Sequence, residues 1–270
     1  MTNISAAVVI CAYTEQRWDL IRSAIASVRA QSVPPEQIFL VVDHNDTLLA
    51  RCLREWPADG QTAGPAVQVV ANRYPGRLGS ARNTAAELLT TDVVAFLDDD
   101  AAADPTWLQT LLAVYRQEPA AVAVGGAPQP QYLTRRPGWF PVEFNWVYGC
   151  HYPGLPEERA TTRHLIGASM SVRVDALLKV GGFHSDNHDD MDLSHRVADQ
   201  YGPAAVIYEP RATVRHTVTA ERVTWNYFWH RCFQVNRGKV LAFADLGEAG
   251  NLSAELRFAR DMAARVTRRL

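Results

Sequence analysis

The sequence predicts an α/β protein in which helices flank a mostly parallel sheet. Short apolar runs alternate with segments of helical spacing through the first hundred residues. This order is typical of parallel strands joined by right-handed crossovers. Polar residues follow the expected strands where each strand ends, and ligands of open parallel sheets lie beyond those carboxyl ends. The 270 residues suffice for a full core, as one large domain or as two closely joined halves.

The elements of the first half follow from the spacing of apolar residues. Residues 6–12 form a continuous apolar run, which suits a strand buried on both faces. Apolar side chains recur at helical spacing in 18–30, and Pro34 and Pro35 end that segment. The same criteria predict strands at 37–42, 67–71 and 93–97, and helices at 46–56 and 81–89.

The second half is less regular. We expect helices at 107–115, 174–180 and 190–201, and strands at 121–126, 164–172 and 205–208. Residues 137–156 are rich in aromatic residues, proline and glycine, which favours a long shaped loop. Two helices, 222–243 and 254–270, should form a C-terminal helical extension. The last of these, with arginines beside apolar residues, either lies on an anionic membrane or packs on the domain as an ordinary amphipathic helix.

The composition excludes several classes of protein. A formal net charge of -2 argues against wholesale nucleic-acid binding, which needs a basic surface. The cysteines are scattered, without the close pairs of a zinc site or a dense disulfide framework, so a reducing compartment fits best. No run reaches the roughly 18 apolar residues of a membrane span, and the first residues contain no signal core. We therefore expect a cytoplasmic protein without a transmembrane segment.

Three consecutive aspartates, Asp98, Asp99 and Asp100, follow the apolar run 93–97. Desolvated carboxylates repel one another unless a cation or hydrogen bonds compensate. Alternate side chains of an extended chain share a face, so Asp98 and Asp100 can point into one site while Asp99 points elsewhere. Hard oxygen ligands of this kind suit Mg²⁺ or Mn²⁺ shared with phosphate oxygens. The alternative is a strand end followed by an Asp-rich turn, with Asp104 capping the next helix.

Several motifs stand in a consistent order along the chain. They are V-V-I-C-A-Y-T at 8–14, F-L-V-V-D-H-N-D at 39–46, G-S-A-R-N-T-A at 79–85, F-L-D-D-D at 96–100, G-G-F at 181–183, H-D-D-M-D-L-S-H-R at 188–196 and V-R-H at 214–216. Together they resemble family 2 glycosyltransferases of the GT-A fold over residues 6–243. The resemblance implies a GT-A catalytic domain at 1–216 and C-terminal helices at 217–270. Within the domain, 1–104 would bind the nucleotide sugar and 105–216 the acceptor.

The resemblance implies a donor site in the N-terminal half, with a UDP-sugar as the expected donor. Asp43 would bind the nucleobase. The family often has two aspartates where this chain has Asp43 and His44, which puts the usual uracil contact in doubt. In the segment from Arg77 to Asn83, Arg82 or Arg77 would approach the diphosphate or the donor sugar. The alternative for Arg82 is a salt bridge inside the first turn of a helix. The base pocket would be lined by Ala12, Tyr13 and Thr14.

The resemblance also implies a metal site for Mg²⁺ or Mn²⁺. The Asp-x-Asp motif would place Asp98 near the ribose and Asp100 on the metal, with Asp99 assisting the sugar or bracing the loop. His216 matches a position where a neutral imidazole adds a ligand, although a lone histidine can equally be structural. A zinc site is disfavoured by the carboxylate neighbours and by the lack of a thiolate partner; its histidines would be His184, His188 and His195.

An inverting transfer needs a base that takes the proton of the acceptor hydroxyl as it attacks, and such a base contributes roughly 10²–10⁴-fold. The motif at 188–196 resembles the family's Glu-Asp motif at a helix N-terminus and aligns Asp190 with the base. Asp189, which replaces the usual Glu, is the competing candidate. Carboxylates at this position are also favoured by the helix dipole without any catalytic role. Three carboxylates in the four residues 189–192 exceed what capping requires, so we favour the base.

The aromatic loop is the expected place of acceptor contacts, through Trp139 and Trp146, with Glu143 as a further carboxylate. A hydrophobic minicore under the loop is the alternative. The acceptor would be a small molecule, a lipid-linked sugar or a glycan, and peripheral membrane contact is compatible with this. The Gln-x-x-Arg-Trp motif of processive relatives is absent, which favours transfer of a single sugar. Arg231 or Arg237 would clamp the diphosphate or form surface salt bridges.

Two other classes of function share this α/β layout. A sugar nucleotidyltransferase typically has a Gly-rich phosphate loop after its first strand, where this chain has Ala12-Tyr13-Thr14-Glu15. A non-catalytic nucleotide-sugar-binding protein would accommodate His44 and the aspartate at Asp189. Both are retained as alternatives to a glycosyltransferase.

Overall fold

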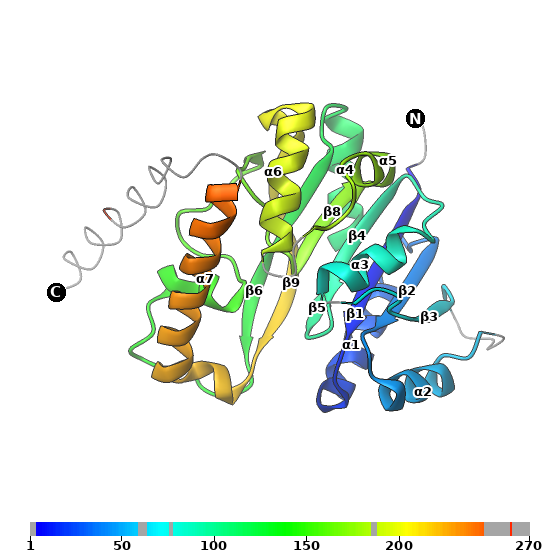
Figure 1. Cartoon of the computed structure of the whole chain (residues 1–270), viewed down its shortest axis with the longest axis horizontal. Helices are drawn as coiled ribbons and strands as arrows, with labels where there is room; N and C mark the ends of the chain where they lie inside the picture. Colours follow the sequence, from blue (N-terminus) through cyan, green and yellow to red (C-terminus); the bar gives the residue numbers. More distant parts are fainter. Residues whose placement is uncertain (1–3, 59–63, 76–77, 185–187, 246–259, 261–270) are drawn as a thin grey trace.

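The computed structural model describes residues 4–58, 64–75, 78–184, 188–245 and 260, with 238–245 described by their backbone alone. Most of the expected helix 254–270 and the candidate Arg77 therefore lie outside the described residues. The described chain forms a nine-stranded sheet with helices on both faces (Figure 1). The strand order is β3-β2-β1-β4-β8-β6-β9-β5, and β7 pairs with β9.

The first four strands of the chain form the parallel half of this sheet, as predicted. β1 (Ala6–Ala12) lies between β2 (Gln37–Val42) and β4 (Val93–Asp98), and β2 also pairs with β3 (Val67–Ala71). The connecting helices are α1 (Trp18–Arg29), α2 (Asp46–Glu55) and α3 (Leu78–Ala86). α3 begins three residues before the expected helix 81–89. Gly79 and Ser80 are residue types typical of turns, so the sequence pattern places them before the helix, but they are helical here.

Side chains of β1 alternate between two cores, one on each face of the sheet. Val8 and Ile10 belong to the core under α1, α2 and α4 (Trp107–Gln117). Ala7 and Val9 belong to the core under α3, α5 (Val174–Lys179) and α6 (Asp189–Tyr201). The prediction of a strand buried on both faces is confirmed. Because helices cover both faces, the polar residues of the site collect at the carboxyl ends of the strands.

The second half adds antiparallel pairs to the sheet. β8 (Ser169–Arg173) runs antiparallel to β4 and to β6 (Ala123–Tyr132). β9 (Val206–Val218) runs parallel to β6 and antiparallel to β5 (Ala101–Ala103) and β7 (Ala160–Thr161). β8, β5 and β7 thus oppose the other strands, and the sheet as a whole remains mostly parallel.

Three of these strands differ from their predicted bounds for local reasons. β6 continues beyond the expected end at 126 through Pro128 and Pro130, which is tolerated because this part of β6 pairs with β9 alone in the described sheet. β8 begins only at Ser169, because the backbone N–H groups of Leu165 and Gly167 bond to side chains of α6 instead of a strand. β9 is much longer than the expected 205–208, since Pro210 interrupts its apolar pattern without ending the strand.

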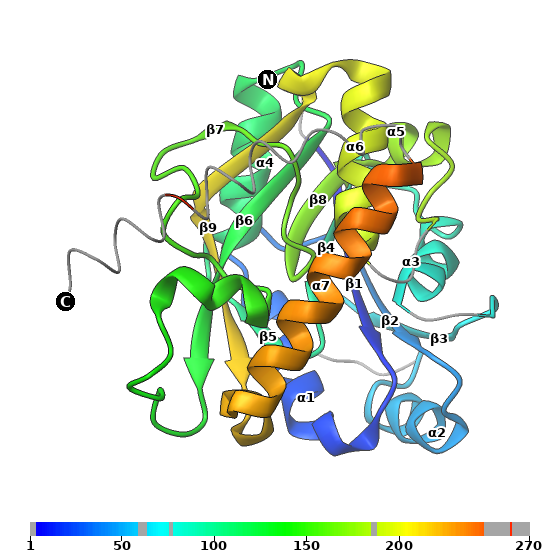
Figure 2. The same ribbon diagram turned by 60° about the vertical axis from the view of Figure 1, so that its left-hand side comes forward.

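A third apolar cluster lies beside the sheet and consists mainly of aromatic side chains. It joins the 3₁₀ segment η2 (Val142–Tyr148), inside the expected loop, to α7 (Trp225–Asp245), which follows the short η4 (Ala220–Val223) (Figure 2). Phe140, Tyr148 and Phe228 are buried in this cluster. The aromatic residues of the loop therefore form the minicore expected as one of two alternatives. Among the described residues, no helix combines the length and the apolar character needed to cross a bilayer.

At Gly126 the backbones of β6 and β9 approach each other closely. The register between the two strands shifts between Gly125 and Ala127. A Cβ atom at Gly126 would overlap the carbonyl oxygen of Ala212 and lie 2.5 Å from Oγ of Ser169. Both neighbours are held in the sheet, so neither can move away cheaply. Only glycine fits this position without displacing β9.

Gly126→Ala should therefore destabilise the protein by about 1–3 kcal/mol or more, because the added methyl group overpacks the β6–β9 contact. Chemical denaturation followed by circular dichroism measures this change. Gly138→Ala is the matched control, since a Cβ at Gly138 has nothing within 4 Å, and its effect should stay within about 0.5 kcal/mol. Equal stability of the two variants would contradict the close approach.

Candidate active site

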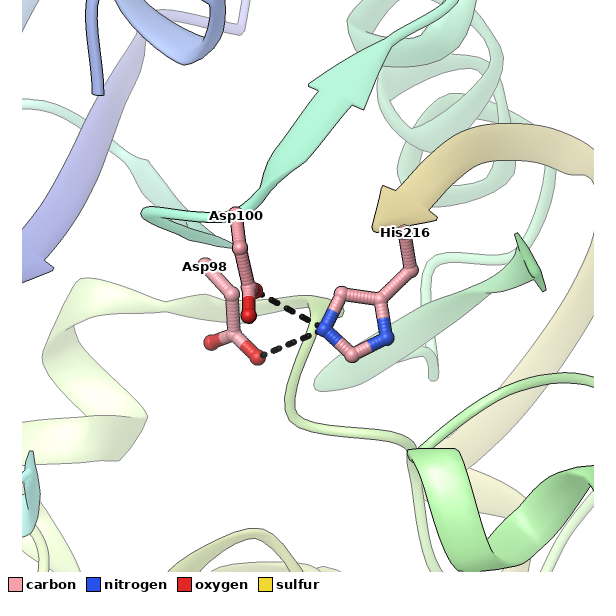
Figure 3. Close-up of side chains that lie close together, drawn as sticks. All are labelled: Asp98, Asp100 and His216. Atoms are coloured by element: carbon pink, nitrogen blue, oxygen red, sulfur yellow. Dashed lines mark hydrogen bonds and ion pairs between the residues drawn. The ribbon is translucent and has the colours of Figure 1, made fainter. Parts of the chain in front are cut away.

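Asp98, Asp100 and His216 meet beyond the carboxyl end of β4. The chain turns after Asp98, and β5 then pairs antiparallel with β9 so that Ala101 lies opposite His216. This register carries the imidazole to the carboxylates: Nε2 of His216 lies 2.9 Å from Oδ1 of Asp100 and 3.8 Å from Oδ2 of Asp98 (Figure 3). One potential ligand atom from each residue lies within 4.8 Å of the other two.

The chemistry of this group fits a divalent cation. Carboxylate oxygens are the ligands of Mg²⁺ and Mn²⁺, and imidazole is a common additional ligand of transition metals. An ion about 2.1 Å from each ligand requires little rearrangement of atoms that already lie within 4.8 Å of one another. Burial raises the pKa of Asp98, which reflects the cost of a desolvated carboxylate that a cation would remove.

Asp100 is surrounded by three cationic side chains. Besides His216, Nη1 of Arg17 and Nη2 of Arg222 each lie 3.2 Å from its Oδ2. Burial alone would raise the pKa of Asp100, but His216, Arg17 and Arg222 hold it well below its usual range. The pKa of His216, which burial alone would lower, is raised well above its ordinary value by Asp100. A metal ion held here needs the neutral imidazole, so it would take the place of that proton.

Asp99 points away from this group, as the alternation of an extended chain predicts. Its Oδ1 accepts a 2.6 Å hydrogen bond from Nη1 of Arg17, and its Oδ2 is buried without a hydrogen-bond partner in the described part of the chain. Burial raises the pKa of Asp99 to about 7, against the opposing effect of Arg17. Asp99 and Asp100 thus share one arginine, which braces the turn between β4 and β5.

Arg82 is fully buried in α3 and contacts both halves of the site. Its Nη1 donates a 2.6 Å hydrogen bond to Oδ2 of Asp189, and its Nη2 lies 3.4 Å from Oδ1 of Asp98 and 3.0 Å from the carbonyl oxygen of Gly167. The guanidinium carbon also lies 5.4 Å from the ring centre of Phe183. The expected alternative, a salt bridge confined to the helix, is wrong, because the partners of Arg82 lie on other elements.

Asp189 and Asp190 begin α6 but have different surroundings. Asp189 is buried against Arg82, and burial raises its pKa to about 6 despite that arginine. Asp190 is only partly buried, and its oxygens accept 2.8 Å bonds from the backbone N–H groups of Gly167 and Met191. Each carboxylate oxygen has a second lone pair, so Asp190 retains acceptor capacity toward a ligand.

A partly buried amide, that of Asn83, joins two of the sequence motifs. The side chain of Asn83 donates a 2.8 Å hydrogen bond to the carbonyl oxygen of Phe183 and accepts one of 2.8 Å from its backbone N–H. A Cβ atom at Gly182 would lie 2.5 Å from Oδ1 of Asn83, and Gly182 has a positive φ of 73°. The motif G-G-F at 181–183 therefore packs against α3, where Phe183 reaches Arg82.

Asp43 lies beyond the carboxyl end of β2, on the same side of the sheet as the carboxyl end of β4. Its Oδ1 accepts hydrogen bonds of 2.7 Å from Nδ2 of Asn72 and 2.6 Å from Nδ1 of His44. Within the described part of the chain, Oδ2 carries no such bond. His44 has a left-handed φ of 46°. The chain therefore turns directly after β2, and Asp43 stays at the carboxyl end of this strand.

The three residues expected in the base pocket lie at the carboxyl end of β1 and directly after it. Ala12 is buried at the end of the strand, Tyr13 is 56% exposed, and the hydroxyl of Thr14 accepts the backbone N–H of Gln16 at the start of a 3₁₀ turn. The Tyr13 ring lies 5.4 Å from the guanidinium carbon of Arg17. An exposed aromatic ring is therefore available beside the carboxylate turn.

The candidates for acceptor contacts differ in where they lie relative to the aromatic cluster. Trp139 stacks on Trp225 with ring centres 4.1 Å apart, and Trp146 and Glu143 pack within η2, where Glu143 is buried. The geometry thus places Trp139 at the margin of the cluster and Glu143 inside it. Arg231 and Arg237 lie exposed on α7.

Sequence reasoning missed Arg17, Arg222 and Cys150. The two arginines contact the aspartate turn, and Sγ of Cys150 lies 3.4 Å from Nδ1 of His216. None of the three belongs to a recognised motif. A signal for Arg17 does exist, because an arginine three residues after the expected base-pocket residues lies near the carboxyl ends of the strands, where the carboxylates collect.

Solved structures of glycosyltransferases share this fold, among them the following two. The structure of GalNAc-T7 with UDP, GalNAc and Mn²⁺ matches with a TM-score of 0.63 and 15% identity over 97% of this chain, which spans 55% of that chain. Mannosyltransferase PcManGT from Pyrobaculum calidifontis, in complex with GDP-Man and Mn²⁺, matches with a TM-score of 0.61 and 16% identity over 98% of this chain and 81% of its own. The predicted GT-A fold of nucleotide-sugar-dependent glycosyltransferases is thereby confirmed.

Sequence comparison identifies the family. The model of Glycosyl transferase family 2 matches residues 7–181. Glucosyl-dolichyl phosphate glucuronosyltransferase from Haloferax volcanii is 33% identical over 241 residues, which are 85% of this chain and 74% of that protein. The chain therefore belongs to glycosyl transferase family 2 and is a glycosyltransferase.

Arg82→Met should destabilise the protein by about 3–5 kcal/mol, because it leaves the buried Asp189 and the partly buried Asp98 without their cation. The uncompensated carboxylates take up protons as the pH falls, so the loss should shrink from about pH 8 to about pH 5. Urea unfolding across this range measures both effects. Arg22→Met is the control: it breaks an exposed 3.0 Å pair with Glu55 and should cost less than about 1 kcal/mol at every pH. A pH-independent loss in Arg82→Met would argue against the ionic role.

Proposed function

We propose that this glycosyltransferase moves a single sugar from a UDP-sugar to an acceptor hydroxyl, with inversion at the anomeric carbon and with the help of Mg²⁺ or Mn²⁺. The observation that carries the proposal is the contact chain from Asp98 through Arg82 and Gly167 to Asp190. This chain of contacts supports a division of roles, in which the carboxylates at the end of β4 would serve the cation and the leaving diphosphate and Asp190 would serve the acceptor.

The nucleotide would lie across the carboxyl ends of β1 and β2. Oδ2 of Asp43 is the acceptor for a nucleobase N–H, because Oδ1 already accepts bonds from Asn72 and His44. Ala12, Tyr13 and Thr14 would line this pocket, with the exposed Tyr13 ring against the base. The two solved GT-A relatives hold UDP in one case and GDP-Man in the other, which supports a nucleoside diphosphate leaving group.

Asp100 and His216 would hold the divalent ion, with Asp98 near the ribose. The bound ion supplies charge neutralisation on the departing diphosphate, worth several kcal/mol in the transition state. The Mn²⁺ of the two GT-A relatives supports this assignment. Asp99 and Arg17 brace the turn that carries Asp98 and Asp100. Arg82 keeps Asp98 oriented and shields it from Asp189.

Asp190 is the proposed base. As the acceptor hydroxyl oxygen attacks the anomeric carbon, its proton passes to a carboxylate oxygen of Asp190, and the bond from that carbon to the diphosphate breaks. Backbone N–H groups of Gly167 and Met191 hold the carboxylate in place, which is the positioning that general-base catalysis requires. Asp189 is less suited to this role because its buried oxygen is committed to Arg82 at 2.6 Å.

Asp190→Asn should lower turnover by about 10²–10⁴-fold while donor binding persists, because an amide retains the shape of the side chain but cannot take the proton. Release of UDP from a panel of UDP-sugars, with water as the acceptor, measures turnover, and calorimetry measures binding. Asp192→Asn is the control on the same helix, since Asp192 pairs with Arg196 at 2.7 Å and should leave turnover unchanged. Unchanged turnover in Asp190→Asn would remove this residue from the base role.

Removal of the divalent ion should abolish UDP release, and added Mn²⁺ should restore it. In calorimetry with Mn²⁺ alone, Asp100→Asn and His216→Asn should each weaken binding by at least about tenfold, as loss of one ligand predicts. Asp199→Asn, an exposed carboxylate on α6, should bind Mn²⁺ as the wild type does. Full activity in excess EDTA would refute the metal assignment.

A further inference from the structure

α7 presents a row of large side chains to solvent. Trp225, Trp229 and Phe233 follow one another at intervals of four residues and are 52%, 64% and 68% exposed. Residues four apart lie on the same side of a helix, and the next position in the row is the exposed Arg237. A contiguous aromatic row of this kind is uncommon on the surface of a protein that has no partner for it.

The other side of the helix is fixed to the protein. Phe228 and Val235 are buried, and Phe228 packs against Phe140 and Phe144 of the aromatic cluster. α7 packs on η2 and η4 and lies on the outside of the molecule (Figure 2). The aromatic row therefore faces outward because the opposite side of the helix packs on the aromatic cluster.

The charge of this segment differs from that of the rest of the chain. Between Arg222 and Ala244 the sequence contains Arg231, Arg237 and Lys239 but no aspartate or glutamate, although the whole chain has a formal net charge of -2. Tryptophan and phenylalanine enter the boundary between lipid headgroups and acyl chains, and flanking basic side chains are attracted to anionic lipids. The aromatic row and the basic residues beside it together have the properties expected of a helix that binds an anionic membrane surface.

We propose that α7 docks this enzyme on an anionic lipid bilayer, with Trp225, Trp229 and Phe233 in the headgroup region. A second copy of the chain fits this surface less well. In a two-fold symmetric contact the same patch faces itself, so the arginines of one α7 would oppose those of the other. Between 222 and 244 the sequence has no carboxylate to offset that repulsion, and the nearest ones, Glu221 and Asp245, lie at the two ends of the segment.

Docking through α7 would orient the active site toward the membrane. Arg222, which contacts Asp100, stands three residues before Trp225, and Trp225 stacks on Trp139 of the acceptor loop. An acceptor carried by a lipid would then reach the carboxylates without leaving the bilayer. This orientation rests on the proposed function, whereas membrane binding itself does not. The Haloferax volcanii relative is named for a dolichyl phosphate substrate, which agrees with a lipid-borne acceptor.

Flotation of the full chain with lipid vesicles tests the docking surface. The wild type should float with vesicles of phosphatidylcholine mixed with phosphatidylglycerol, more weakly with phosphatidylcholine alone, and less as salt is raised. The double variant Trp229→Ser/Phe233→Ser should bind at least about tenfold more weakly. The matched control Leu133→Ser/Leu178→Ser removes two other exposed apolar side chains, 60% and 55% exposed, and should bind as the wild type does.

Circular dichroism and thermal unfolding establish that both double variants are folded. Wild-type binding in the Trp229→Ser/Phe233→Ser variant, or equal loss in the control, would overturn the proposal, as would a wild type that does not float. A stable dimer on size-exclusion chromatography that the α7 variant abolishes would also overturn it. UDP release in the absence of vesicles should be equal in wild type and both variants. A folded wild type that floats but releases no UDP would refute the proposed function and leave the docking surface standing.

Discussion

The buried guanidinium of Arg82 is the contact on which the arrangement of the site depends. It comes from the first half of the chain, and its partners Asp189 and Gly167 come from the second. Breaking a buried ion pair from one side costs several kcal/mol because the remaining charge stays desolvated. α3, the end of β4 and the start of α6 are therefore held together by one side chain. The proposed metal ligands and the proposed base keep their separation because the same cation contacts carboxylates on both sides.

A second constraint is the pairing of a very short strand with a long one. β5 has three residues, and its register with β9 sets Ala101 opposite His216. The imidazole reaches Asp100 only because of this pairing, and Arg17 and Arg222 then complete the positive surroundings of that carboxylate. The acidic turn is thus compensated by the protein itself, which explains why two buried aspartates are tolerated at the end of an apolar strand.

Much of the first half could be predicted from the sequence, and less of the second. β1, β2 and β3 have the predicted bounds because continuous apolar runs between turn residues leave little ambiguity. β5 could not be predicted: three alanines have no pattern of their own and form a strand only beside β9. The aspartates and His216 were found through motifs. Arg17 and Arg222 belong to no motif, and only long-range folding brings them to Asp100.

Gly167 has a further consequence for how the two sides of the site can move. Its N–H bonds to Asp190 and its carbonyl oxygen to Arg82, so the two contacts belong to adjacent peptide planes that meet at one Cα atom. Rotation about φ or ψ of Gly167 would shift the contact with Asp190 relative to the contact with Arg82. Any side chain here would also crowd both, since a Cβ would lie 3.2 Å from Oδ2 of Asp190 and 3.4 Å from Nη2 of Arg82. The distance between the Asp190 contact and the Arg82 contact is consequently set by the backbone torsions of Gly167, so a loop motion that changes these torsions would move both contacts at once.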